Sequence, residues 1–171
     1  MDVEKAKSVP PEITKTIYEI LSNFFFNLES YRVLSGHISS LKLNDSTRPL
    51  WIVFSNNCLM MAAVEWCKVF GSERNNKTHY TKCIEDLDGI NDIANDMKEF
   101  RDKYIAHSDF YNKPVPIMEK AVNVVRQFDK AMIAKYGLDG QETTEEVINA
   151  YREDIRQRFS LMVTGKERSI G

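Results

Sequence analysis

Residues 48–70 read RPLWIVFSNNCLMMAAVEWCKVF, with apolar side chains on nearly every face of the helix that their spacing predicts. A helix that is apolar all round is typical of a central element covered by other helices on several sides. Gly71 follows directly, and glycine is the residue type that most often ends a helix. We therefore expect this segment to be the central helix of the fold.

Helical spacing of apolar residues recurs on both sides of this segment, and the alternation typical of β-strands is nearly absent. Before it, apolar residues at steps of three and four run from Ile13 to Leu41, after the early-helix residue Pro11. After it, the pattern predicts a short helix and then three longer ones, over about residues 78–87, 89–106, 118–136 and 143–162. The last begins at the capping box Thr143-Thr144-Glu145-Glu146.

Amphipathic helices joined by short loops predict an all-α fold, an antiparallel helical bundle of four to five long helices plus one short helix. The 171 residues contain no Gly/Ser linker, so residues 1–171 fit a single domain. We expect a core bundle over about residues 14–136 and an additional C-terminal helix over 142–164. That helix would be peripheral or part of an oligomer interface.

Composition excludes several classes of protein. Hydrophobic residues make up 43% and charged residues 28%, which argues against wholesale disorder, and the net charge of −2 creates no global positive field for nucleic acid or membranes. Three cysteines without C-x-x-C spacing indicate neither a disulfide framework nor a zinc site. The N-terminus lacks the apolar core of a signal peptide, and the most apolar run, residues 58–64, is far shorter than the roughly 20 residues of a membrane span. We expect a cytoplasmic protein that does not contact membranes.

His107 is the best candidate for chemistry, because phosphate-binding loops, nucleophile elbows and the H-E-x-x-H motif are absent. Apolar residues form one stripe along the predicted helix: Ile90, Ile93, Met97, Phe100 and Tyr104. His107 lies three residues after Tyr104 and therefore continues this stripe. A row of inward-facing residues therefore ends on an ionisable group beside a loop. Arg101 lies about 100° round the helix from the stripe and about 120° from His107. One copy of the chain does not aim both groups at one spot, unless the long arginine side chain, unwinding after Ala106 or a second protomer brings them together.

Both residues also have a plain structural interpretation. A histidine that ends an apolar stripe is commonly a core or capping residue. An arginine such as Arg101 is commonly the partner of a surface carboxylate, here Asp96 or one near Glu99.

Residues 101–107, Arg-Asp-Lys-Tyr-Ile-Ala-His, resemble the R-x4–6-H motif of the HEPN superfamily (higher eukaryotes and prokaryotes nucleotide-binding domains). The longer string EFRDKYIAHSD, over residues 99–109, resembles the subgroup related to bacterial phage abortive-infection proteins. EWCKVFG over residues 65–71, together with the nearby His79, is also similar to that subgroup.

The resemblance implies a helical bundle that dimerises and acts as a metal-independent endoribonuclease without a cofactor, as a toxin or antiphage effector. His107 would be the general base or acid that moves the proton of the RNA 2′-hydroxyl, and Arg101 would clamp the phosphate. Asp102 would orient one of them. The Arg and His pairs of two protomers would form one composite site, and the products would end in 2′,3′-cyclic phosphate.

Further RNA contacts are expected at Lys103, His79, Arg74, Lys77 and Lys82. The resemblance also suggests a neutralising antitoxin or a regulatory protein as a partner. The alternative function is a non-catalytic helical dimer that binds a nucleotide or a protein partner and keeps the motif for structure.

Overall fold

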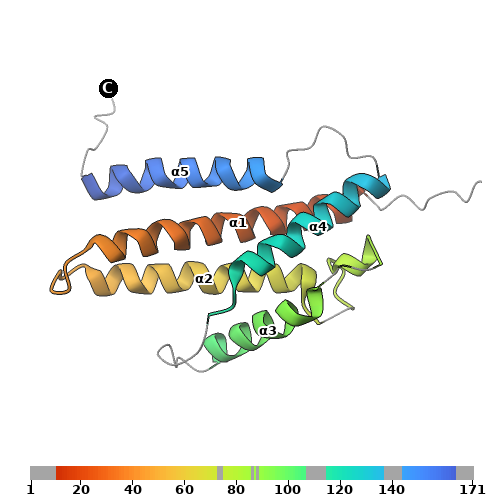
Figure 1. The fold of residues 1–171 in the computed structure, drawn as a ribbon, viewed down its shortest axis with the longest axis horizontal. Coiled ribbons are helices and arrows are strands. Elements are labelled where there is room, and N and C mark those ends of the chain that lie inside the picture. Colours follow the sequence, from red (N-terminus) through yellow and green to blue (C-terminus); the bar gives the residue numbers. More distant parts are fainter. Residues whose placement is uncertain are drawn as a thin grey trace, which may run out of the picture.

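The structure is a computed structural model that describes residues 11–72, 75–85, 87, 89–106, 115–136 and 144–164. These residues contain no β-strand, and successive helices reverse direction (Figure 1). The elements are α1 (Pro11–Ser40), α2 (Arg48–Phe70), a 3-10 turn (Tyr80–Lys82), α3 (Ile90–Ala106), α4 (Met118–Tyr136) and α5 (Thr144–Thr164). The predicted all-α bundle is confirmed. The prediction of a short helix over residues 78–87 is wrong in extent, because the described residues of this segment form only the 3-10 turn.

The α1–α2 hairpin is closed by side chains of its connecting loop. The backbone N–H and the hydroxyl of Thr47 both donate to Asp45 Oδ1, at 2.8 and 2.6 Å. The Arg48 guanidinium donates to the carbonyl oxygens of Ile38 and Leu41, both at 3.0 Å. Carbonyls at a helix C-terminus lack intrahelical partners, so Arg48, the first residue of α2, caps the end of α1.

The C-terminal half of α2 lies at the centre of the core. Trp66 is fully buried, and its indole N–H donates to the carbonyl oxygen of Ala121 on α4, at 3.2 Å. Phe70 packs edge-on against Phe128 of α4, with ring centroids 5.6 Å apart. Gly71 ends the helix where a Cβ would clash with the carbonyl oxygen of Cys67. This half of α2 is the central element that the sequence predicts.

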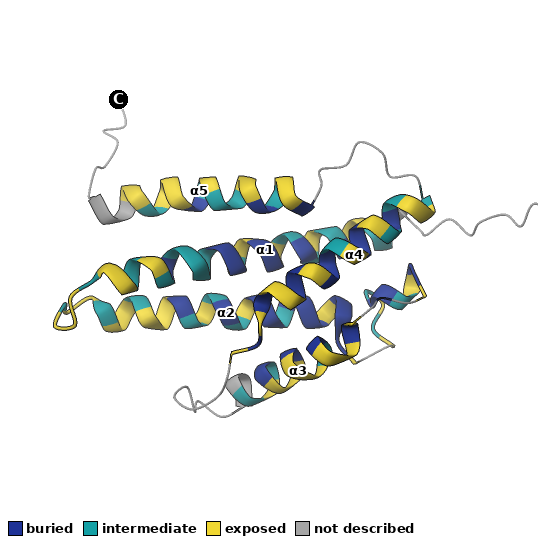
Figure 2. Cartoon of the chain, in the orientation of Figure 1, coloured by how far each residue is buried: buried dark blue, intermediate teal, exposed yellow. Residues whose placement is uncertain are grey.

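The N-terminal half of α2 departs from the prediction, because apolar residues there face solvent. Leu50, Val53 and Phe54 are 53%, 54% and 46% exposed. Figure 2 shows the buried positions of α2 concentrated towards its C-terminal end, where α3 and α4 cover it. The prediction that residues 48–70 are packed on all sides is wrong for the first half of α2. In the second half the bundle buries most residues, although Met61 remains 45% exposed.

α2 is also the one helix, among the residues that the structure describes, that is long and apolar enough to cross a membrane. Of its most apolar window, 39% is buried inside the molecule. Core helices of soluble proteins meet the same criterion of length and composition, so this finding alone does not assign α2 to a membrane.

A buried carboxylate on α4 joins three helices. Asp129 is 8% exposed and accepts a hydrogen bond from the Tyr18 hydroxyl of α1, at 3.0 Å. It also accepts from the backbone N–H and the hydroxyl of Thr144, the first residue of α5, at 3.2 and 3.0 Å. Burial, with the charge of Asp129, raises the pKa of Tyr18 well above its usual range. Asp129 therefore positions the start of α5.

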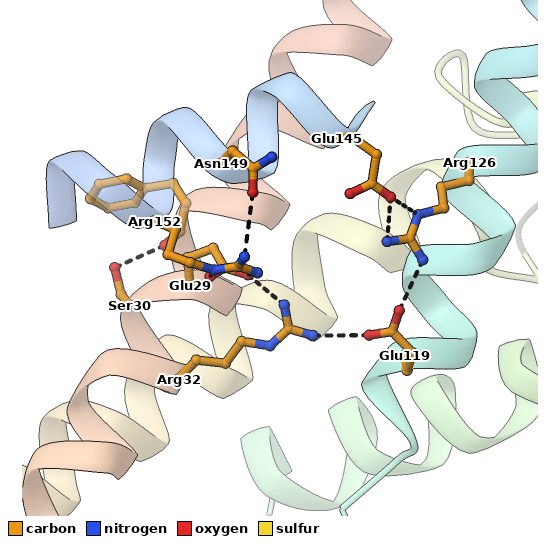
Figure 3. Close-up of polar contacts among 9 residues, drawn as sticks. Glu29, Ser30, Arg32, Glu119, Arg126, Glu145, Asn149 and Arg152 are labelled. Carbon is orange, nitrogen blue, oxygen red and sulfur yellow. Dashed lines mark hydrogen bonds and ion pairs between the residues drawn. The ribbon is translucent and has the colours of Figure 1, made fainter. Parts of the chain in front are cut away.

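A second buried carboxylate, Glu29 of α1, holds α5 along α1 (Figure 3). Its side chain is 1% exposed and pairs with Arg32, nearly one turn further along α1. Glu29 Oε2 also lies 2.9 Å from Nε of Arg152 on α5. Because a carboxylate removed from water needs charged partners, these contacts select one register of α5 on α1.

The same ion-pair network continues to α4 (Figure 3). Arg32 Nη2 lies 3.2 Å from Glu119 of α4. Arg126 of α4 donates to Glu119 at 2.9 Å and to Glu145 of α5 at 2.6 Å. The hydrogen bond from Arg126 holds the pKa of Glu119 below its usual range, against the opposing effect of burial. Helices α1, α4 and α5 are therefore tied together by charge as well as by apolar packing.

We expect Glu29→Ala to lower the free energy of unfolding by about 2–3 kcal/mol, because it leaves two arginines without their buried partner. The loss stays below that of a fully buried pair, since the side chains of Arg32 and Arg152 are 34% and 36% exposed and can be hydrated. Urea unfolding monitored by circular dichroism measures the change. Glu19→Ala, on the same helix but 62% exposed, is the control and should have little effect. Equal effects of both substitutions would contradict the role given to Glu29.

Candidate functional site

α3 presents one buried face to the bundle, and the candidate motif lies in its C-terminal half. Ile90, Ile93, Met97 and Phe100 are at most 6% exposed, which confirms these four members of the predicted stripe. α3 ends at Ala106, so His107 follows the helix directly. His107 and the side chain of Tyr104 lie outside the described residues.

The structure brings Arg101 and Asp102 together. Arg101 Nε donates to Asp102 Oδ1 at 2.8 Å, and Nη2 lies 2.7 Å from the same oxygen. The Arg101 side chain is 25% exposed and that of Asp102 is 50% exposed. A carboxylate that engages two guanidinium nitrogens restricts the rotamers of the arginine. The orienting role of Asp102 in catalysis stays a prediction.

Carboxylates surround the predicted RNA contact at Lys103. Its ammonium pairs with Glu99, one turn earlier on α3. A cavity of about 310 Å³ opens beside them, lined by Asp96, Glu99, Phe100, Lys103 and residues 115–117. The described residues of this lining include two carboxylates and one ammonium, and their net negative charge repels phosphate. The lining does not include Arg101, so this cavity is not the phosphate site that the motif predicts.

His79, expected as an RNA contact, has a structural role in the segment after α2. It is 3% exposed, and the Thr81 N–H donates to its Nδ1 at 3.3 Å. Because Nδ1 accepts, a neutral ring carries its proton on Nε2, which donates to the Gly71 carbonyl at 2.8 Å. The imidazole thus joins the end of α2 to the 3-10 turn and is too deeply buried to contact RNA in this conformation. Lys77 is exposed in the same segment, and Arg74 lies outside the described residues.

Glu65 is a buried carboxylate in the C-terminal half of α2, and it is not among the site residues predicted from the sequence. Glu65 is 5% exposed, and its Oε1 lies 2.6 Å from Lys68 Nζ. Its Oε2 is buried and has no hydrogen-bond partner among the residues that the structure describes. The sequence does contain a signal for this residue, which is a glutamate among the apolar residues of the predicted central helix. A buried oxygen without a partner costs free energy, so Glu65 is a candidate functional residue on the helix that packs against α3.

The described cysteines and acids indicate neither a thiol nucleophile nor a metal centre. Burial raises the pKa of the Cys58 and Cys83 thiols, which disfavours the reactive thiolate. No group of three or more His, Cys, Asp or Glu side chains is placed to hold a metal ion within the described part of the chain.

No protein-family model matches the chain, and comparisons with curated proteins and with solved structures find no match. The resemblance to the HEPN superfamily therefore rests on the quoted motifs and stays a prediction.

We expect His79→Ala to lower the free energy of unfolding by about 1–3 kcal/mol, because the Gly71 carbonyl and the Thr81 N–H lose a buried partner. Lys77→Ala, at an exposed position in the same segment, is the matched control and should leave thermal unfolding unchanged. Unaltered stability of the His79 variant would contradict the structural role.

Glu65→Gln tests whether Glu65 contributes to stability or to function. We expect the free energy of unfolding to stay within about 1 kcal/mol, since replacing a poorly paired buried charge is often neutral or stabilising. Thermal unfolding measures it, with Glu153→Gln on the exposed face of α5 as the control. A loss above about 2 kcal/mol would show instead that the Lys68 pair stabilises the fold.

Proposed function

We propose that this chain is a metal-independent endoribonuclease of the HEPN type, with Arg101 and His107 as its catalytic residues. The observation that carries the proposal is the contact between Arg101 and Asp102 in the last turns of α3. Arg101 directly follows Phe100, a member of the buried stripe that His107 is expected to continue. An oriented, partly exposed guanidinium near a helix end suits a phosphate clamp. A cytoplasmic location, a role as a toxin or antiphage effector and control by an antitoxin belong to the same proposal.

The chemistry needs no metal. His107 accepts the proton of the 2′-hydroxyl as its oxygen attacks the adjacent phosphorus. Arg101 stabilises the charge that develops on the non-bridging oxygens, and the 5′-oxygen leaves with a proton from a second acid. The RNA is thereby divided into a 2′,3′-cyclic phosphate and a 5′-hydroxyl product.

A second copy of the chain completes the proposed site. His107 is six positions after Arg101, which sets the two about 120° apart on a regular helix. The two protomers of a homodimer can supply four groups around one phosphodiester, including both the base and the acid.

Arg101→Ala and His107→Ala should each lower cleavage of single-stranded RNA in EDTA by at least about 100-fold, the scale of a general acid–base or oxyanion contribution. Arg158→Ala is the matched control, since this arginine is exposed on α5 and paired with Asp154. Circular dichroism and thermal unfolding establish that each variant is folded, and analysis of the RNA termini checks for the cyclic phosphate. Cleavage that survives both substitutions, or no cleavage across varied RNAs, would refute the nuclease.

A second candidate function, the non-catalytic helical dimer, is favoured by the acidic lining of the cavity beside Lys103. In a chain with net charge −2, that lining weakens attraction for RNA next to the motif. Here His107→Ala would lower the melting temperature, and no RNA product would appear with the wild-type chain.

A further inference from the structure

Residues 49–64 of α2 include an exposed apolar surface without charged side chains. No charged residue occurs between Arg48 and Glu65, whereas the other four helices carry acidic and basic residues on their exposed faces. Leu50, Val53, Phe54 and Met61 are nevertheless 53%, 54%, 46% and 45% exposed. Depletion of charge together with exposed large apolar side chains is the compositional signature of an interface core.

These residues form a single stripe, which we call the α2 stripe: Leu50, Val53, Phe54, Asn57, Met60, Met61 and Val64. At about 100° of rotation per residue, every member lies within about 60° of the direction of Asn57. Asn57 is exposed, and Met60 and Val64 are half-buried. The stripe presents on the order of 400 Å² of apolar surface, within the range of the largest single patch on a typical monomer, which is often functional.

The α2 stripe is complementary to itself. Its members are spaced nearly symmetrically about Asn57, with Leu50 and Val64 each seven residues away. A two-fold axis through Asn57 would set α2 antiparallel to its copy and place residue 57 + k opposite residue 57 − k. Leu50 would then meet Val64 of the copy, Val53 would meet Met61, and Phe54 would meet Met60.

The one polar member of the stripe fits this symmetry. On the axis, Asn57 meets only its own copy, and an amide is a side chain that can donate to and accept from an identical group. We propose that the α2 stripe is a homodimer interface, with a second copy of this chain packed antiparallel across Asn57.

A second copy fits the stripe better than a lipid bilayer does. A helix that binds a membrane surface is typically rich in lysine and arginine beside its apolar face, but Arg48 is the only basic residue between residues 43 and 67. The C-terminal half of α2 is buried in the core, so a membrane-spanning α2 would require the bundle to open. A bilayer would also leave the amide of Asn57 without a partner.

The size of the stripe suits a reversible dimer. Each partner in a standard interface buries roughly 800 Å², about twice the apolar area of the stripe. A small apolar centre within a wider polar rim is the usual anatomy of such contacts. The stripe interface does not depend on the nuclease chemistry, and its test involves no RNA. A dimer untouched by the stripe substitutions would refute the interface alone, whereas a dimer that cleaves no RNA would refute the nuclease alone.

Analytical ultracentrifugation of the full chain over a range of concentrations tests the interface. We expect a reversible dimer for the wild type, and at least a 100-fold weaker dissociation constant for Phe54→Glu and Met61→Glu. Each substitution enters the interface twice because of the two-fold axis, and both positions are exposed, so the fold is retained. Gln127→Glu, at an exposed position on α4, is the matched control and should dimerise as the wild type does.

Cross-linking tests the axis itself. In a Cys58→Ser background, Asn57→Cys should form a covalent dimer on mild oxidation, since residues on a two-fold axis bring their Cα atoms within the ~4.4–6.8 Å of a disulfide. Asn95→Cys, exposed on α3, is the control and should stay uncoupled.

A wild-type monomer at high concentration, or a dimer untouched by both glutamate substitutions, would overturn the proposal. Flotation of the wild type, but not of Phe54→Glu, with phosphatidylcholine vesicles would overturn it in favour of a membrane surface.

Discussion

Burial of the C-terminal half of α2 is the constraint on which the rest of the structure depends. Trp66, at its centre, is in contact with α4 through the carbonyl of Ala121 and lies beside Phe70 and the rings that cluster around it. An apolar surface on all sides of a helix can be removed from water only if several neighbours cover it. Helices α1, α3 and α4 do so, and their positions follow from this shared contact.

The polar contacts have a different role, which is to choose one arrangement among those that apolar packing allows. Hydrophobic contacts are weakly directional, whereas Asp129 and Glu29 each accept from partners at one position of α5 only. Each carboxylate is almost fully buried, and a shift of α5 by one turn would remove the contact of Asp129 with Thr144 and that of Glu29 with Arg152. This explains how a helix with a largely exposed outer face keeps a defined place on the bundle.

The same bundle leaves two features unsatisfied, and both are informative. The Oε2 atom of Glu65 is buried without a partner in the described part of the chain, and the first half of α2 exposes apolar side chains without charge. A fold shaped only for stability would remove both, because each costs free energy. The first points to a role for Glu65 beside α3, and the second to a surface that another copy of the chain covers in our proposal.

The sequence by itself determined the class of the fold and, within a residue or two, the bounds of α1, α2, α3 and α4, because helical periodicity and caps such as Pro11 and Gly71 are local signals. It also placed Arg101 beside a buried stripe, since that relation is internal to one helix. Tertiary structure alone decided that His79 is a buried cap, that Glu29 binds Arg152, and that only half of α2 is covered. These depend on which helix passes over which, and such contacts between residues far apart in the chain leave no periodic trace in the sequence.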